Sequence, residues 1–376
     1  MKTVYLDYNA TTPTDKDVLI EMLPYFDCHF GNPSSIHTLG QKCTHAIDEA
    51  RLRISRLISA NPDEIIFTGS GTEANNLALL GTAFSKMHKG SHIISTQIEH
   101  SSVYETCKIL EKHGITISFV SPDGNGTINP REIESKITNK TFLISVMTAN
   151  NETGAIQNIK EISKIAGDNS IIMHTDAVQA AGKMPLNVNE LDVDLLTLSA
   201  HKIYGPKGVG ALYVKRGIRL NPLIFGGGQE KKIRAGTENV PGIVGFGKAA
   251  EITAQNLNKN ILFYTRIRDY FENLILLKIK TASVNSKNTI RVPNTSNINF
   301  NEQENEKLLV KLDLNGICAS SGSACGASSR EPSRILKSMN LPPSKLYGSI
   351  RFSFGLNTTF EDINYTISVL EKILNK

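Results

Sequence analysis

The sequence lacks tryptophan, and it lacks any apolar run of the roughly 18 residues needed to span a bilayer. Its five cysteines are an odd number with no close pair at metal-ligand spacing, so we expect neither a disulfide framework nor a structural zinc site. The first residues, MKTVYLDYNATT, have no apolar core of the kind found in signal peptides. These absences predict a protein of the reducing cytoplasm with no membrane segment and no metal.

A strong excess of one charge is also missing. Lysine and arginine number 41 against 36 aspartate and glutamate, which leaves a net charge of +5 over 376 residues. The basic clusters are short and have no interleaved aromatic residues, so we do not expect direct contact with nucleic acid. With 40% hydrophobic and 20% charged residues, the composition is that of an ordinary globular enzyme.

Apolar runs alternate with helical patterns from about residue 64 to 214, which predicts a mostly parallel sheet covered by helices on both faces. Two of these runs end at Asp176 and at Ser199, and Lys202 follows the second. Both side chains should therefore lie at the carboxyl edge of the sheet, where ligands bind. A lysine can form a Schiff base with pyridoxal phosphate (PLP), while a carboxylate keeps the pyridine nitrogen protonated. Taken alone, a turn-forming aspartate and an ordinary surface lysine explain the same pattern.

Three further features lie at strand ends, and each has two explanations. The glycine-rich turn at 69–71 precedes a helix and could bind phosphate, although such turns are common and this one is not a Walker loop. His100 could stack on a flat cofactor and carry protons, or it could be a structural histidine. The polar run 150–154 could bind a ligand or cap a helix.

The pattern changes toward the C-terminus. Residues 296–300 and 349–354 alternate polar and apolar as half-exposed strands do, and helical patterns lie around them, which predicts a small α+β lobe. Between these elements, residues 318–333 are rich in serine, glycine and alanine and include Cys325. We expect this segment to be mobile or closely fitted to another surface, and its thiol to be exposed, either incidental or reactive.

Over nearly its whole length the sequence resembles the cysteine desulfurase family, which has the class V aminotransferase fold. The matching motifs are YLDYNATT at 5–12, GNPS at 31–34, TE at 72–73, EH at 99–100, NNE at 150–152, HTDAVQ at 174–179, SAHK at 199–202, RAGT at 234–237, SSGSAC at 320–325 and SIRFS at 349–353. The resemblance implies an α/β protein of PLP fold type I, whose large domain contains a mostly parallel sheet of seven strands. We expect a large PLP-binding domain over residues 16–260, and a small α+β domain made of residues 1–15 and 261–376.

The resemblance also implies individual roles. Lys202 would hold PLP as a Schiff base, Asp176 would pair with the pyridine nitrogen, and His100 would stack on the ring and shuttle protons. The remaining cofactor-binding residues would be Gly71, Thr72, Asn151, Gln179, Ser199, His201 and Thr237, with Gln179 near the phenolic oxygen and Thr237 reaching the phosphate of a neighbouring subunit. Arg351, helped by Asn9 and Asn151, would hold the substrate carboxylate, because its planar donors match a carboxylate.

The implied reaction removes sulfur from L-cysteine, leaving L-alanine and a persulfide on Cys325. The implied partners are a second copy of the chain, sharing active sites, and a sulfur-acceptor protein of iron–sulfur cluster assembly, thio-modification or DNA phosphorothioation. Two other hypotheses stay open: a different PLP enzyme, such as an aminotransferase in which Cys325 is incidental, and a basic protein that binds nucleic acid without catalysis. Keto-acid formation would favour the first, and steep salt-dependent DNA binding the second.

Overall fold

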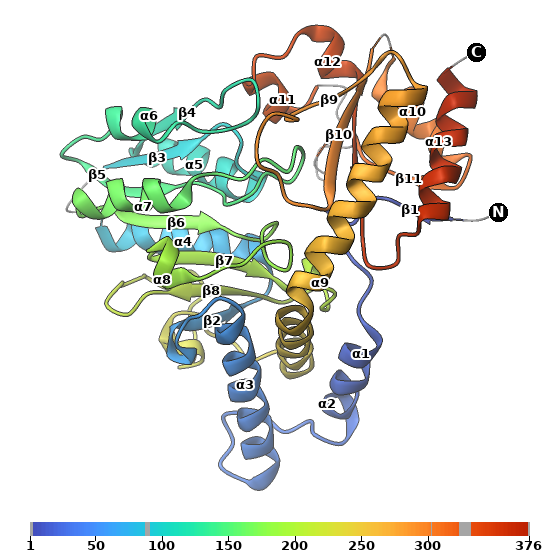
Figure 1. Cartoon of the computed structure of the whole chain (residues 1–376). Helices are drawn as coiled ribbons and strands as arrows, with labels where there is room; N and C mark the ends of the chain where they lie inside the picture. Colours follow the sequence, from blue (N-terminus) through green and yellow to red (C-terminus); the bar gives the residue numbers. More distant parts are fainter. Residues whose placement is uncertain (1–2, 87–90, 302, 323–331, 375–376) are drawn as a thin grey trace.

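The computed structural model describes residues 3–86, 91–301, 303–322 and 332–374. Its main feature is a seven-stranded mixed sheet (Figure 1). The strands, in spatial order, are β2 (Ile65–Thr68), β8 (Gly210–Val214), β7 (Leu195–Ser199), β6 (Ile172–Asp176), β5 (Thr141–Ser145), β3 (His92–Thr96) and β4 (Thr116–Val120). All neighbours from β7 to β4 are parallel, and β8 is antiparallel to both β2 and β7. The expected seven-stranded, mostly parallel sheet is confirmed.

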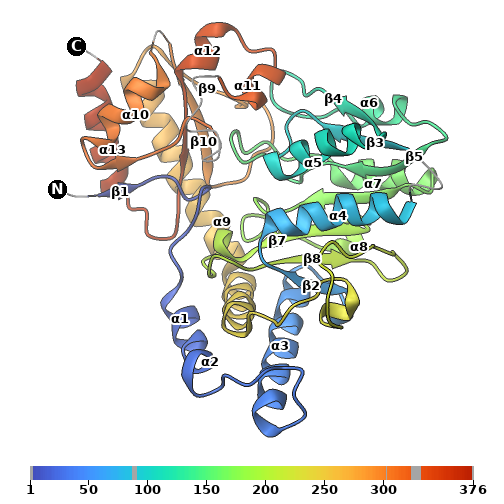
Figure 2. The ribbon, with the colours of Figure 1, turned by 180° about the vertical axis from the view of Figure 1, so that it is seen from behind.

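Helices cover both faces of this sheet (Figures 1 and 2). One face carries α4 (Gly71–Lys86) and α5 (Ser101–Lys112), whose apolar side chains form one hydrophobic cluster with the strands. The opposite face carries α3 (Thr38–Leu57), α6 (Pro130–Ser135), α7 (Ile159–Asp168), α8 (Val188–Leu191) and the first half of α9 (Val240–Lys278), and α1 (Lys16–Met22) packs against α9. The short α2 (Pro24–Asp27) follows α1. The runs ending at Asp176 and Ser199 are the neighbouring parallel strands β6 and β7, so both end at one edge of the sheet.

A separate hydrophobic cluster surrounds a small antiparallel sheet with the order β12 (Ser349–Ser353), β10 (Thr295–Phe300), β9 (Ala282–Val284). It includes Val4 and Leu6 of the N-terminal segment and the second half of α9, so this one helix connects the two cores. The other elements of this unit are β1 (Val4–Tyr5) paired with β11 (Ile317–Cys318), α10 (Asn305–Asp313) and α13 (Phe360–Leu374). Between them in sequence, α11 (Arg334–Ser338) and α12 (Pro343–Gly348) pack against the large core through Ile335, Leu336 and Leu346. The separate core supports a small α+β unit, while its boundary near residue 260 stays a prediction.

The half-exposed character expected for the strands at 296–300 and 349–354 is wrong. Every residue of β10 and β12 is buried. The apolar residues face the small core, and the alternate polar residues face inward toward the loop 149–154 and the N-terminal segment. We call this second set the small-sheet polar face; it consists of Thr295, Asn297, Asn299, Ser349, Arg351 and Ser353. Polar and apolar residues alternate along a strand when its two faces meet different surroundings. In β10 and β12 the polar face meets other parts of the protein rather than water.

Three absences can be stated for the described residues alone. No helix in the described ranges is long and apolar enough to cross a membrane. No group of histidine, cysteine, aspartate or glutamate side chains among them is arranged to hold a metal ion. Cys28, Cys43, Cys107 and Cys318, the four described cysteines, are free thiols.

Candidate active site

A cavity of about 210 Å³ lies at the carboxyl edge of the large sheet, against Arg351 of the small sheet. Its lining residues that the sequence predicts to be functional are Asn9, Gly71, Thr72, His100, Asn151, Asp176, Gln179, Ser199, His201, Lys202 and Arg351. The fold therefore gathers side chains from positions 9 to 351 around one space. Ala10, Ser70, Asn75, Ser102, Met147 and Val178 complete the wall.

Asp176 is the last residue of β6 and is buried. Its Oδ1 accepts the backbone N–H of Val178 at 3.0 Å, and its Oδ2 accepts Asn75 Nδ2–H at 2.8 Å. Asp176 is thus buried at the cavity with both carboxylate oxygens held by donors, an orientation that suits a carboxylate that pairs with a protonated ring nitrogen.

Asn75 is a site residue that the sequence reasoning missed. It lies one turn into α4, and its amide also donates to Ser102 Oγ at 2.8 Å, so it connects Asp176 to the start of α5. Asn75 follows Gly71 by four residues and so lies on the same face of the helix, and this spacing could have indicated that Asn75 also faces the ligand. Its Oδ1 is buried and has no hydrogen-bond partner in the described protein.

His100 is the N-cap of α5, with Nδ1 accepting the Ser102 backbone N–H at 3.1 Å and lying 2.8 Å from Ser102 Oγ. Burial lowers the pKa of His100, and nearby Lys202 and Arg334 lower it further, while Asp176 opposes the shift. A neutral imidazole whose Nδ1 accepts a hydrogen bond carries its proton on Nε2.

Lys202 ends the short 3-10 helix η2 (Ala200–Lys202), directly after β7. Its Nζ donates to the backbone oxygens of Asn9 and Ala10, at 2.6 and 2.7 Å. The N-terminal segment is fixed to the same turn, because the Thr12 N–H donates to the His201 backbone oxygen. The amine therefore lies at the cavity wall beside the N-terminal segment.

The N-terminus of α4 forms the end of the cavity suited to a phosphate. Ser70 precedes this 16-residue helix and Gly71 and Thr72 begin it, where N–H groups and the helix dipole favour an anion. A Cβ on Gly71 would lie 3.2 Å from both Ser199 Cβ and Val178 Cγ2, a tight contact that glycine avoids. His201 contacts Thr11 Oγ1 at 3.1 Å, and burial lowers its pKa to about 4, so its ring is neutral at pH 7.

Arg351 closes the cavity from the small sheet and is 1% exposed. Its guanidinium donates to Asp7 Oδ1 at 2.6 Å and to the Asn151 backbone oxygen at 3.1 Å, while its buried Nε has no partner in the described protein. Asn9 is fixed nearby, with its Nδ2 donating to Asn151 O at 3.1 Å and to Thr295 Oγ1 at 2.8 Å. A cation with a spare donor is thus preset to receive a carboxylate.

Gln179 lines the cavity with an amide whose Nε2 donates to the Asn9 backbone oxygen at 3.0 Å. Its Oε1 accepts from Lys183 Nζ at 2.6 Å. Lys183 is a second residue that the sequence reasoning missed. One buried lysine among many surface lysines leaves no periodic signal in a single sequence.

Two predicted site residues are not brought to this cavity. Thr237 is exposed in the loop before α9, so its expected contact with a neighbouring subunit stays a prediction. Cys325, expected to be the nucleophile, lies outside the described residues.

The residues present fit PLP. Lys202, Asp176 and the N-terminus of α4 line one cavity. An amine, a carboxylate and a helix N-terminus match the aldehyde, the ring nitrogen and the phosphate of that cofactor, in this order. Asn75 Oδ1, Asn151 Oδ1 and Arg351 Nε are buried there without partners, as expected where a polar ligand completes the hydrogen bonding.

Comparison with known proteins agrees with this fold and site. The family model for class-V aminotransferases matches residues 4–366, and the chain belongs to the aminotransferase class-V family. Within that family it is a cysteine desulfurase, a PLP-dependent enzyme that acts on cysteine.

The similar proteins cover the chain almost completely. The cysteine desulfurase IscS of Dictyoglomus turgidum is 50% identical over 375 residues, covering 100% of this chain and 95% of the relative. A solved NifS-like protein superposes with a TM-score of 0.94 at 34% identity, with full coverage of both chains. SspA, solved in complex with cysteine, has a TM-score of 0.83 and 37% identity over 94% of this chain and 99% of its own.

Proposed function

We propose that Lys202, Asp176 and His100 form the PLP site of this cysteine desulfurase, and that Cys325 is the nucleophile that removes sulfur from L-cysteine. The observation that carries the proposal is the convergence of Asp176, at the end of β6, and Lys202, just after β7, on one cavity. The phosphate end is assigned to Gly71, Thr72, Ser199 and His201, and further cofactor contacts to Asn151 and Gln179.

The protein residues prepare the cofactor's reactivity. Bound PLP supplies a protonated pyridine ring that accepts electrons when a bond to the substrate's α-carbon breaks. Asp176, whose carboxylate is oriented by hydrogen bonds from Val178 and Asn75, would hold the proton on the ring nitrogen. Asn75 therefore acts on the ring through Asp176.

Proton movement is assigned to Lys202 and His100. The Lys202 amine, at the end of its side chain on the cavity wall, accepts and returns a proton at Nζ. His100 is neutral because burial lowers its pKa, and it can give up and recover a proton at Nε2. The two groups reach the cavity from different elements, His100 from the start of α5 and Lys202 from the turn after β7, so each can move a proton of its own.

Substrate binding is assigned to Arg351, with Asn9 and Asn151 beside it. The carboxylate of L-cysteine would replace part of the hydrogen bonding now made between Arg351 and Asp7. Because Arg351 is almost fully buried, water would screen its attraction to the carboxylate only weakly, so this contact would be strong.

The sulfur is proposed to leave on Cys325 as a persulfide and to pass to an acceptor protein, in iron–sulfur cluster assembly, thio-modification or DNA phosphorothioation. The Cys325 thiolate forms the new S–S bond as the carbon–sulfur bond of the substrate breaks; the electron pair left on the substrate's β-carbon takes up a proton, and L-alanine is released. The four described cysteines are free thiols, which supports the reducing cytoplasm as the compartment.

A homodimer with shared active sites is also proposed, with Thr237 of one copy reaching the phosphate site of the other. Large apolar side chains around α1, α2 and the loop before α3 support it: Ile36 is 92% exposed, and Phe26 and Phe30 are also exposed. Phe225, in the loop region before Thr237, is 83% exposed. Exposed apolar groups of this size are typical of a surface that a partner covers. Light scattering should give twice the chain mass.

We propose domains of residues 16–260 and of 1–15 with 261–376; the two hydrophobic cores follow this division except at Val292, Ile335, Leu336 and Met339, which join the large core. Limited proteolysis followed by mass analysis would test that boundary.

The decisive experiment for the chemistry incubates PLP-loaded protein with L-cysteine and a reductant. Alanine and sulfide should appear in equal amounts. Cys325→Ala should retain the visible cofactor band but form no persulfide, whereas persulfide at the parent rate in that variant would remove Cys325 from its role.

A further inference from the structure

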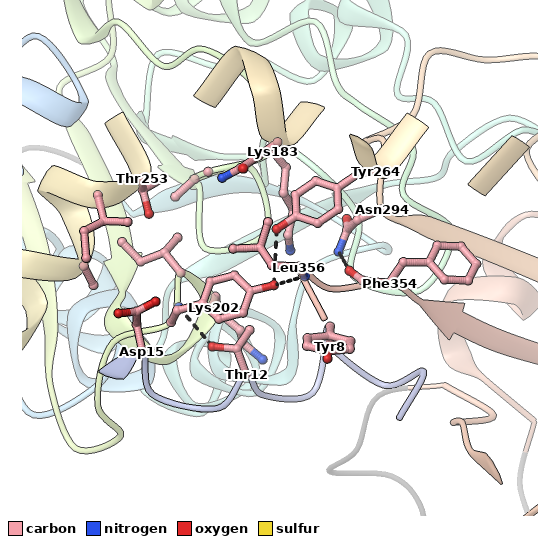
Figure 3. A pocket seen from close by; sticks show the side chains of 17 residues that line it. Tyr8, Thr12, Asp15, Lys183, Lys202, Thr253, Tyr264, Asn294, Phe354 and Leu356 are labelled. Atoms are coloured by element: carbon pink, nitrogen blue, oxygen red, sulfur yellow. Dashed lines mark hydrogen bonds between the residues drawn. The ribbon is translucent and has the colours of Figure 1, made fainter. Parts of the chain in front are cut away.

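Lys183 is a second buried amine beside the active site, and no step proposed above uses it. It follows β6 in the turn that contains Gly182, whose φ is +73°, and its side chain is 5% exposed. Figure 3 shows Lys183 and Lys202 among the side chains that line one small cavity, together with Asp15, Tyr264 and Asn294. Lysines are rarely buried without a specific partner, so its contacts require an explanation.

The contacts of Lys183 lead directly to the cofactor-facing amide. Its Nζ donates to Gln179 Oε1 at 2.6 Å and, more weakly, to Asn9 Oδ1 at 3.4 Å. On the other side of the amide, Gln179 Nε2 donates to the Asn9 backbone oxygen, which also accepts from Lys202 Nζ. Lys183 is therefore linked through the Gln179 amide to Asn9 O, the oxygen that Gln179 shares with the proposed cofactor lysine, Lys202.

This arrangement fixes which way the Gln179 amide points. A glutamine amide has a carbonyl oxygen and an NH₂ group that occupy nearly the same space, so only its partners decide its orientation. A donor at Lys183 holds the oxygen, and an acceptor at Asn9 holds one hydrogen of Nε2. The second Nε2 hydrogen is left for the cavity that Gln179 lines.

The charges around Lys183 favour an uncharged amine that can still donate. Burial lowers its pKa well below the usual range, and the neighbouring cations Lys202 and Arg351 lower it further. The other ionisable groups around it are His201, whose pKa is lowered mainly by burial, and the residues that line the same small cavity, Tyr8, Asp15, Tyr204 and Tyr264. A neutral amine keeps two N–H donors, so it holds Gln179 without adding a third positive charge to the site.

We propose that Lys183 is a positioning residue, which holds Gln179 Oε1 so that an Nε2–H of this amide faces the cavity and donates to the phenolic oxygen of PLP. The proposal rests on the proposed function, which assigns Gln179 to the cofactor. Without Lys183 the amide can turn, and its carbonyl oxygen would then face an anionic oxygen, which is repulsive.

The test is a pH titration of the visible absorption of PLP-loaded protein. In Lys183→Met the phenolic oxygen loses a donor that stabilises its anion, so the midpoint of the absorption change should move to higher pH by about one unit, a tenfold change in proton affinity. Gln179→Leu should move it in the same direction. The double variant should move no further than Gln179→Leu alone, because Lys183 acts only through that amide. Lys160→Met, on an exposed site of α7, is the matched control and should leave the midpoint unchanged.

The outcomes separate three cases. An unchanged midpoint in Lys183→Met, or an additive shift in the double variant, overturns the positioning role. A lowered unfolding temperature with an unchanged midpoint also overturns it, because that is the result of a structural role alone. If Lys183→Met does not fold, Lys183→Gln keeps an N–H donor and should move the midpoint upward by less; no movement overturns the proposal. The parent protein should show a visible cofactor band that Lys202→Ala abolishes. If the parent shows no such band, or if the band persists in Lys202→Ala, the proposed function is overturned, and this inference with it.

Discussion

The carboxyl edge of the large sheet and the small-sheet polar face enclose the same cavity but hold their polar groups differently. The large-sheet edge carries the groups whose pKa values are displaced, namely His100 and His201, together with the buried acid Glu99. The polar face carries mainly neutral side chains, and its one cation, Arg351, is already paired with Asp7.

This difference indicates a division of labour. Groups whose pKa values are displaced are suited to moving protons, and they follow the strand ends of the large sheet. Groups held by fixed neutral hydrogen bonds are suited to orienting a substrate, and they project from the small sheet. Substitutions on the first side should therefore change the chemistry or its pH dependence, and substitutions on the second side should change binding or stability.

The largest effect is expected for Lys202→Ala. It removes the amine that is assigned both the cofactor linkage and proton transfer, so alanine formation from L-cysteine should fall by roughly 10⁴-fold. Lys160→Ala, an exposed lysine on α7, should retain parent activity. A Lys202→Ala protein with more than a tenth of parent activity would contradict the role assigned to the large-sheet edge.

The next effect concerns Glu99, which is fully buried beside His100. Burial raises its pKa to about 8, although Thr96 and the Met147 N–H donate to its Oε1. Between pH 4.5, its ordinary pKa, and pH 8 the folded protein keeps a proton that the unfolded chain releases, so stability falls as pH rises through this window.

Glu99→Gln should remove this pH dependence. Urea denaturation measures the free energy of unfolding of the parent and of the variant at each pH. From pH 5 to pH 8 the parent's value should fall relative to that of the variant by about 2–4 kcal/mol. The matched control is Glu132→Gln on the exposed surface of α6, which should show no such trend. A constant difference across the window would mean that Glu99 is ionised throughout.

Arg351→Lys should act on binding rather than chemistry. Lysine keeps the charge but loses the planar fork, so the KM for L-cysteine should rise about 10–100-fold, corresponding to loss of a charged hydrogen bond, with a smaller change in kcat. The visible band of the bound cofactor should be unchanged. A large fall in kcat with constant KM would place Arg351 with the proton-moving groups instead.

The smallest effect is expected for Asn297→Leu on the small-sheet polar face. Asn297 Nδ2 donates to the Glu152 backbone oxygen at 3.2 Å, and its Oδ1 accepts from Asn285 at 2.7 Å. Removing these neutral hydrogen bonds should lower the free energy of unfolding by about 1–2 kcal/mol and leave the pH profile of activity unchanged. Asn258→Leu, exposed on α9, is the matched control for denaturation. A displaced pH profile in Asn297→Leu would break the division between the two sides.

Part of the site was predictable because short-range patterns carry it. Apolar runs that stop at Asp176 and Ser199 indicate parallel strand ends, and the structure places them on neighbouring strands. The helix start at Gly71 follows in the same way from a glycine turn after a strand. Asn75 and Lys183 were missed, because an asparagine on a helix and a lysine in a turn look ordinary until the partners Asp176 and Gln179 are located.

The sequence by itself determined the alternating strands and helices, the two strand ends with their acid and amine, and through its ordered motifs the family. Only the tertiary structure decided what surrounds each side chain. It buried β10 and β12 on both faces, brought Asn9 between Gln179 and Lys202, and enclosed the Lys183 amine beside the cations Lys202 and Arg351. The physical reason is that periodicity is a local property of the chain. Desolvation and hydrogen-bond partnership depend on segments hundreds of residues apart, so they exist only after the chain has folded.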